Sequence, residues 1–210
     1  MPAASPTGRR RLLLHVCCAL CASKALTALR RDEPEVWDIT LYWANPNIHP
    51  LIEWRRRLKA VRMLADRERL PLLETGTGGD SGYGLTPFAR AIGGRENRPD
   101  RCGICYALRM DATAQAAKEG GFNAFSTTLF TSPWQDHARL KVAAERAAAA
   151  TGVPLAYRDW RTEPENRAMT AGLYRQQTCG CVWSEFDRYA PTTLHVWPPP
   201  PPRPRPQSQP

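Results

Sequence analysis

The stretch RLLLHVCCALCAS, residues 11–23, places an apolar run directly before three cysteines. Residues 11–16 predict a buried strand, because short continuous apolar runs are typical of strands inside a sheet. Residues 22–32 follow with apolar side chains at helical spacing. The stretch therefore predicts a strand that leads through a cysteine-rich turn into a helix.

Strand-like and helix-like segments alternate along the rest of the chain. Further strands are expected at 36–43, 71–74, 123–129 and 153–159, and further helices at 51–70, 86–93, 102–121, 135–151 and 164–177. This alternation predicts an α/β fold, with a Rossmann-like, mostly parallel sheet and helices on both faces. Functional groups in such sheets gather beyond the carboxyl ends of the strands, so we expect a metal site at that edge.

The composition suits one domain. With 210 residues, of which 42% are hydrophobic, the chain is long enough to bury a substantial core. We expect a disordered leader over residues 1–10, a single α/β catalytic domain over 11–190, and a Pro-rich disordered tail over 191–210. No apolar run approaches the roughly 18–20 residues that span a membrane, so we expect a cytoplasmic protein with no membrane partner.

The net charge of +9 comes mainly from arginine, because only four of the 29 basic residues are lysines. Arginine binds phosphate through two nitrogens and stacks on bases, which favours a nucleic-acid partner. A genome whose base composition favours arginine codons would give the same excess. Composition alone leaves both interpretations open.

The cysteines form three groups and leave no singleton. The groups are Cys17, Cys18 and Cys21; Cys102 and Cys105; and Cys179 and Cys181. Structural disulfides are rare in a reducing cytosol. Metal binding or redox catalysis is therefore the expected use of these side chains.

Two pairs of cysteines together suit a metal centre. Cys17 and Cys18 are adjacent, whereas Cys102 and Cys105 form a C-x-x-C motif at the start of a helix, where the helix dipole stabilises thiolates. Four thiolates suit Zn²⁺ or an iron–sulfur cluster. Two such different pairs, far apart in the chain, make a poor zinc knuckle and favour the cluster.

The remaining cysteines have more than one interpretation. Cys179 and Cys181 flank a single glycine, and a disulfide between them would close a small strained ring of the labile, redox-active kind. Alternatively, both are further metal ligands. Cys21 could bind a second metal, act as a thiol near the substrate, or pack as a small buried side chain.

In this order, the cysteine motifs and the segments around them resemble the QueH-type epoxyqueuosine reductase family. The resemblance covers roughly residues 11–189 and rests on LLLHVCCALCA, YWANPNIHP, EWRRRL, RCGICYALRM, FSTTLFTSP and LYRQQTCGCVWS. The chain departs from the family pattern at Leu20, where proline is usual, at Trp134, where tyrosine is common, and at Trp183.

The resemblance implies reduction of the epoxide of epoxyqueuosine, at the wobble position of tRNA, to the alkene of queuosine. It implies a [4Fe-4S] cluster on Cys17, Cys18, Cys102 and Cys105, with a second iron as a further option. It also implies catalytic roles for Cys179 and Cys181 as a redox-active pair, and for Cys21. The implied partners are a tRNA that carries epoxyqueuosine and an external electron donor that the sequence does not identify. No cobalamin is implied.

Other polar and aromatic residues are candidates for proton donation or RNA contact. The candidate acids are Asp111, Asp136, Asp159, Glu185, His15 and His49, and the candidate RNA contacts are Arg55, Arg56, Arg57, Arg101, Arg109, Arg175, Tyr106, Trp134 and Tyr174. For the carboxylates, the histidines and Tyr106, a structural or solvated role is the more common one, and for the arginines the alternative is a solvated helix face. The GGDS stretch at 78–81 lacks the spacing and position of a phosphate-binding loop, which disfavours an ATP-dependent tRNA thiolase. A non-catalytic zinc module that binds RNA is the other alternative.

Overall fold

The computed structural model describes residues 8–76 and 82–192. Most of the expected leader, nearly all of the Pro-rich tail and the whole GGDS stretch lie outside the described residues. Within the described part of the chain, no helix has the length and apolar character needed to cross a membrane.

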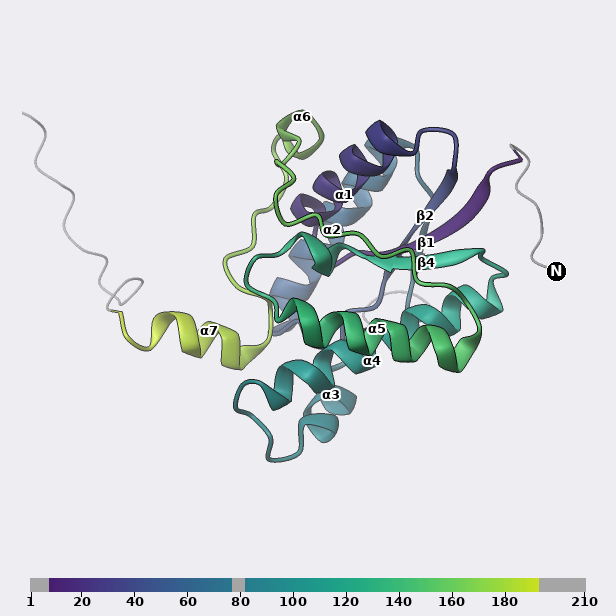
Figure 1. Ribbon diagram of the computed structural model, residues 1–210. Coiled ribbons are helices and arrows are strands. Elements are labelled where there is room, and N and C mark those ends of the chain that lie inside the picture. Colours follow the sequence, from purple (N-terminus) through teal and green to yellow (C-terminus); the bar gives the residue numbers. More distant parts are fainter. Residues whose placement is uncertain (1–7, 77–81, 193–210) are drawn as a thin grey trace, which may run out of the picture.

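The centre of the fold is a parallel sheet of four strands (Figure 1). The strands are β1 (Arg10–His15), β2 (Trp37–Trp43), β3 (Leu72–Glu74) and β4 (Ala124–Thr127), in the spatial order β3-β2-β1-β4. Leu12 on the central strand pairs with Ile39 of β2 and Ala124 of β4. Leu12, Leu13 and Leu14 are all fully buried, because helices cover both faces of β1. The predicted α/β fold is confirmed.

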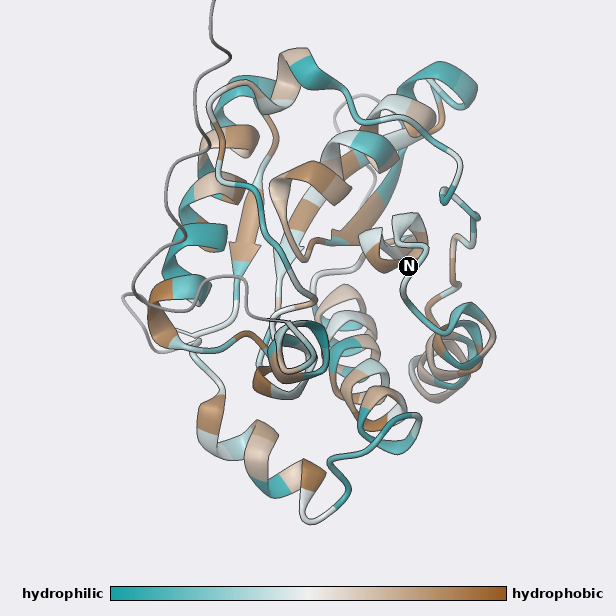
Figure 2. Ribbon diagram, turned by 90° about the vertical axis from the view of Figure 1, so that its left-hand side faces the viewer, coloured by the Kyte–Doolittle hydropathy of each residue, from teal (hydrophilic) through white to brown (hydrophobic). Residues whose placement is uncertain are grey.

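Figure 1 shows α1 and α2 on one side of the sheet and α4 and α5 on the other. The helices are α1 (Ala19–Asp32), α2 (Leu51–Glu68), α3 (Leu85–Ile92), α4 (Asp100–Glu119), α5 (His137–Thr151), α6 (Arg167–Thr170) and α7 (Val182–Tyr189), with a 3-10 turn η1 (Thr128–Thr131) after β4. In Figure 2 the strands are largely brown, and the helices around them carry teal, hydrophilic residues on part of their surface. The apolar pattern that predicted these helices therefore faces the sheet.

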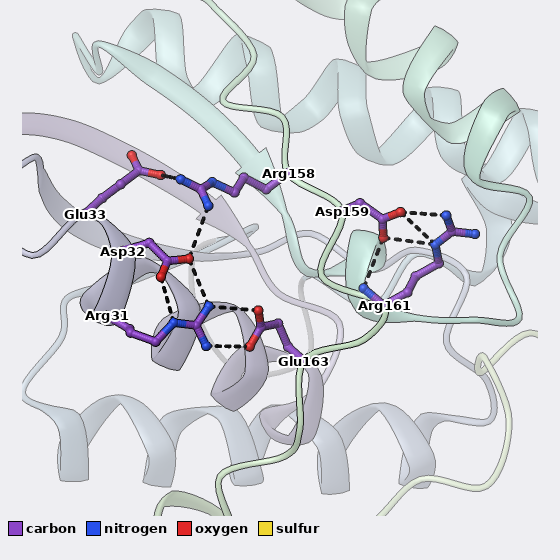
Figure 3. Close-up of polar contacts among 7 residues, drawn as sticks. All are labelled: Arg31, Asp32, Glu33, Arg158, Asp159, Arg161 and Glu163. Atoms are coloured by element: carbon purple, nitrogen blue, oxygen red, sulfur yellow. Dashed lines mark hydrogen bonds and ion pairs between the residues drawn. The ribbon is translucent and has the colours of Figure 1, made fainter.

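The strand predicted at 153–159 is wrong. Only an isolated bridge between Phe125 and Leu155 forms, because Pro154 has no N–H and offers the sheet only its carbonyl, 3.0 Å from the Phe125 nitrogen. The segment then leaves the sheet and is held to the end of α1 by ion pairs (Figure 3). Arg158 contacts Glu33 at 2.6 Å, and Arg31 contacts Glu163.

The helix predicted at 164–177 is also mostly wrong, because only the four residues of α6 are helical. Gly172 follows closely with a φ of +72°, in the left-handed region that ends helices. The chain from Gly172 to α7 is therefore irregular, and it runs back to the carboxyl edge of the sheet, where the last two cysteines lie.

Candidate functional site

The first cysteine group lies where β1 and β4 end. His15 and Thr127 are the last residues of these neighbouring strands, and their side chains meet at 2.8 Å between Nδ1 and Oγ1. Just beyond the two strand ends, the Cys17 backbone N–H donates to Thr128 Oγ1 at 3.2 Å. The Thr128 hydroxyl also lies 3.6 Å from Cys17 Sγ. The parallel sheet thus fixes the first thiol at its carboxyl edge, as the sequence predicted.

The sulfur atoms of Cys17, Cys18 and Cys21 lie within 4.8 Å of one another. Cys18 is the N-cap of α1, and its Sγ accepts a hydrogen bond from the Cys21 backbone N–H at 3.3 Å, so the first helical turn brings Cys21 back to Cys18. Gln176 donates to Cys18 Sγ at 2.8 Å from the irregular segment before α7. In the described ranges, this is the one set of three or more His, Cys, Asp or Glu side chains whose ligand atoms converge so closely.

The pKa values of these three thiols differ in direction from the usual value. Hydrogen bonds from Cys18 and Cys21 hold the pKa of the Cys17 thiol well below its usual value, and the Arg109 charge and the Thr128 hydroxyl add to the effect. Burial raises the pKa of Cys18, and the hydrogen bond with Cys17 raises the pKa of Cys21 to about 12. Cys17 is therefore the first of the three to become a thiolate, which is the form that binds metal.

Three of the other four cysteines form a second group. Cys102 lies in the first turn of α4 and Cys105 in the next, because α4 begins at Asp100, two residues earlier than the C-x-x-C motif predicted. Cys105, Cys179 and Cys181 pack together against the apolar residues of α3. Cys102 packs against the main core instead. The three-cysteine group above thus contains Cys21, whereas Cys105 lies with the Cys179–Cys181 pair.

The Cys179–Cys181 pair is held as two free thiols whose sulfur atoms are 3.8 Å apart. The hydrogen bond from Cys181 lowers the pKa of Cys179 to about 5. The same hydrogen bond, together with burial, raises the pKa of Cys181. One thiolate and one thiol therefore coexist at neutral pH, which is the arrangement expected of a reactive pair.

The backbone of this pair is clamped by α2 and by the loop after β2. Arg57 is buried and donates from Nη2 to the Thr178 carbonyl at 3.1 Å and from Nη1 to the Cys179 carbonyl at 3.2 Å. Its Nε donates to Glu53 at 2.6 Å. The His49 backbone N–H donates to the Gly180 carbonyl at 2.8 Å. Arg57 therefore positions the thiol pair.

Arg109 of α4 lies between the two cysteine groups. Its guanidinium donates to Asn45 Oδ1 at 2.7 Å, and lies 3.4 Å from His15 Nε2 and 4.0 Å from Cys105 Sγ. Its positive charge acts to lower the pKa of Cys17 and Cys179, whereas burial raises the pKa of Cys105 to about 11 despite the same charge. Sulfur from all three cysteine motifs therefore gathers within electrostatic reach of one buried cation.

The buried position of three arginines excludes the RNA contact that the sequence suggested for them. Arg57, Arg101 and Arg109 are each at most 4% exposed. Arg101 pairs with Asp187 and Arg57 with Glu53. By contrast, the Trp134 side chain is 81% exposed in the loop after η1, so it remains available for stacking on a base.

Most of the candidate acids have structural partners. Asp111 pairs with Arg146, Asp136 caps α5 by accepting from the Arg139 backbone N–H, and Asp159 pairs with Arg161 (Figure 3). Glu185 lies exposed in the first turn of α7.

The two candidate histidines are also constrained. Burial lowers the pKa of His15 to about 3, with Arg109 contributing, so its imidazole is neutral at physiological pH. His49 Nδ1 lies 3.0 Å from the Tyr83 hydroxyl, and burial lowers the pKa of this histidine as well. Neither histidine is an imidazolium acid at neutral pH.

Three residues of the site gave no signal of their own in the sequence. Thr128, Gln176 and Asn45 each contact a cysteine sulfur or the Arg109 guanidinium. Their only sequence indication is that each lies within or directly beside a cysteine motif or a strand end. Neutral polar residues are common in loops, so a position beside a motif or strand end does not by itself identify a site residue.

The donor set fits an iron–sulfur centre better than an oxygen-liganded metal. The converging groups are thiols, and the centrally placed Arg109 would repel a bare cation, whereas it would attract a thiolate-ligated centre. Cysteine thiolates are the ligands of [4Fe-4S] clusters. The converging thiols of Cys17, Cys18 and Cys21 are therefore chemically compatible with an iron–sulfur cluster.

The sequence is similar to known proteins over most of its length. The profile of the family Epoxyqueuosine reductase QueH matches residues 12–187. An epoxyqueuosine reductase QueH of Dehalococcoides mccartyi is 36% identical over 182 residues, which cover 85% of this chain and 94% of the relative. The protein of the same name from Histophilus somni is 32% identical over 189 residues, covering 85% of this chain and 74% of the relative. A solved deacetylase of teicoplanin biosynthesis aligns with a TM-score of 0.42 at 16% identity, over 69% of this chain and 65% of that chain, which is too weak a likeness to indicate function.

Proposed function

The chain belongs to the epoxyqueuosine reductase QueH family, and we propose that it reduces the epoxide of epoxyqueuosine in tRNA to the alkene of queuosine. The observation that most supports this activity is the gathering of the three cysteine motifs around Arg109. A reductase needs electron carriers beside its substrate, and sulfur is the redox-active element that this chain concentrates at the functional edge of its sheet.

The overall reaction balances as a two-electron deoxygenation. The epoxide takes up two electrons and two protons, both of its C–O bonds break, a C=C bond forms, and the oxygen leaves as water. Oxidation of a thiol–thiolate pair to a disulfide releases two electrons and one proton, and the solvent supplies the second proton. The Cys179–Cys181 pair can therefore balance one turnover by forming an S–S bond. An external reductant, such as a protein or small-molecule dithiol, then restores the pair.

We assign a [4Fe-4S] cluster to Cys17, Cys18, Cys102 and Cys105. When bound, such a cluster supplies one-electron transfer beside the substrate. Cys21, whose sulfur lies with those of Cys17 and Cys18, is then available to a second iron or to the substrate.

The thiol pair can supply one proton to the reaction as well as two electrons. Cys179 is the thiolate at neutral pH, whereas Cys181 keeps its proton because its pKa is raised. Cys181 is thus the protonated group of the pair and can hold a proton for the departing oxygen, while the second proton comes from water. The candidate carboxylates are engaged by arginines or by a helix N-terminus, or lie at the surface, which supports a thiol as the proton donor.

The test is mass spectrometry of nucleosides released from epoxyqueuosine-containing tRNA after anaerobic incubation with the reconstituted protein and a chemical reductant. The expected result is loss of epoxyqueuosine with an equal gain of queuosine. A control reaction uses protein from which iron has been removed. A colourless protein that holds one zinc and leaves the nucleoside unchanged would refute the proposal in favour of an RNA-binding zinc module.

A further inference from the structure

Among the described residues, Arg109 is a buried cation without a carboxylate partner. Its side chain is 2% exposed, and in the described part of the chain no carboxylate lies within ion-pair distance of it. The other two buried arginines differ in this respect, because Arg57 has Glu53 and Arg101 has Asp187. An isolated buried charge loses several kcal/mol of solvation, so folded proteins pair or neutralise such groups.

The groups that contact Arg109 supply hydrogen bonds and no compensating charge. Asn45 accepts at 2.7 Å, and its own amide nitrogen donates to the Val16 carbonyl at 2.8 Å, which fixes Oδ1 toward the guanidinium. Arg109 Nε also donates to His15 Nε2 at 3.4 Å, so the imidazole acts there as a hydrogen-bond acceptor. Both partners orient the guanidinium, but neither balances its charge.

The groups around Arg109 that can become anionic are thiols. Cys105 Sγ lies 4.0 Å from Nη1, and the charge of Arg109 also acts on Cys17 and Cys179. These sulfurs come from the turn after β1, from α4 and from the loop before α7. One cation is therefore shared by ligand candidates from three separate segments.

We propose that Arg109 is the built-in counter-charge of a thiolate-ligated iron–sulfur centre and raises the reduction potential of that centre. This inference rests on the proposed function, because it requires the centre to be present. Thiolate ligation gives such a centre net negative charge, and reduction adds one more negative charge. A fixed cation in a low-dielectric pocket stabilises the reduced form more than the oxidised form, so the potential rises.

The test compares Arg109→Met with Arg109→Lys. Methionine keeps much of the side-chain length and removes the charge, whereas lysine keeps the charge and loses the planar fork. Each protein is reconstituted anaerobically, and its reduction potential is measured by a titration followed by visible absorbance and electron paramagnetic resonance. The exposed Arg146→Met variant on α5 is the matched control, because Arg146 is paired with Asp111.

We expect Arg109→Met to make reduction at least tenfold less favourable, which is a shift of 59 mV to a more negative potential for a one-electron couple. Arg109→Lys should recover most of that shift, and Arg146→Met should match the unaltered protein. Loss of the centre in the methionine variant with retention in the lysine variant also supports the proposal, because the charge is what the two variants do not share.

Two outcomes overturn the inference while the proposed function stands. One is an unaltered potential in Arg109→Met, and the other is equal loss of the centre in both variants while circular dichroism shows both to be folded. If the unaltered protein binds no iron, the proposed cluster fails as well, and iron and sulfide analysis of that protein identifies this case directly.

Discussion

Gly180 is the position beside the thiol pair where adding a single methyl group should lower the free energy of unfolding most. Its φ of +106° lies in the region that side chains rarely adopt, so any other residue there is strained. A Cβ atom would also lie 3.0 Å from Ile48 Cγ1 and 3.1 Å from Arg57 Nη1. Arg57 cannot easily move aside, because the same guanidinium holds the Thr178 and Cys179 carbonyls.

The expected loss for Gly180→Ala is the sum of two effects. Backbone strain of this kind costs about 1–3 kcal/mol, and the added crowding brings the total to about 2–4 kcal/mol of unfolding free energy. Gly152→Ala separates the two effects, since Gly152 has a φ of +75° and nothing within 4 Å of its Cβ position. That control should lose only about 1–2 kcal/mol.

The assay is equilibrium unfolding of the metal-free proteins in urea, with the three midpoints compared at a common slope. Equal losses at Gly180 and Gly152 would show that the crowding against Ile48 and Arg57 is unimportant. A loss below about 1 kcal/mol at Gly180 would refute the strained, clamped loop altogether.

Three further predictions concern the thiol pair and the RNA surface. Cys179→Ser should keep the brown colour of the reconstituted protein and lose turnover; bleaching would instead identify Cys179 as a metal ligand. Because the pKa of Cys179 is lowered to about 5, its thiolate persists down to that pH. Its alkylation rate constant in metal-free protein should therefore be flat from pH 8 to 6 and fall roughly tenfold per unit below 5, and a rate that still rises above pH 8 would contradict the lowered pKa. Trp134→Ala removes an 81% exposed ring, so tRNA binding should weaken by about 1–3 kcal/mol with stability unchanged, whereas unaltered affinity would exclude stacking there.

The sequence predicted those parts of the fold that local pattern determines. The apolar run 11–16 could be read as a central strand because β1 is buried on both faces, and the strong amphipathic period of 51–70 matches α2 closely. The segment 153–159 has the same strand-like composition. It forms only one bridge, however, because Pro154 lacks a donor and Arg158 pairs with Glu33 at the end of α1. Such a competition between sheet bonding and tertiary ion pairs has no local signature.

The cysteine motifs were also visible in the sequence, but their grouping in space was not. Spacing alone cannot tell that Cys21 returns to Cys18 through an N-cap hydrogen bond. Nor can it tell that Arg109 is buried between the groups, since arginine near a motif in a basic chain equally suggests phosphate contact. Burial of a charge is decided by the packing of distant segments.

Helix N-termini give the three cysteine motifs a common physical basis. Cys18 caps α1, Cys102 lies in the first turn of α4, and Cys181 caps α7. Each motif therefore lies at the positive end of its own helix, which opposes the burial that raises the pKa of these three thiols.

The helices differ in how they are anchored. Cys17 and Cys18 belong to the main core beside β1, whereas Cys181 packs in a small separate cluster with Phe88 and Ile92. A disulfide formed and broken at Cys181 would therefore disturb α3 and α7 and leave the sheet in place. The same small cluster also contains Cys105, so a proposed cluster ligand and the proposed redox pair share one set of packing contacts.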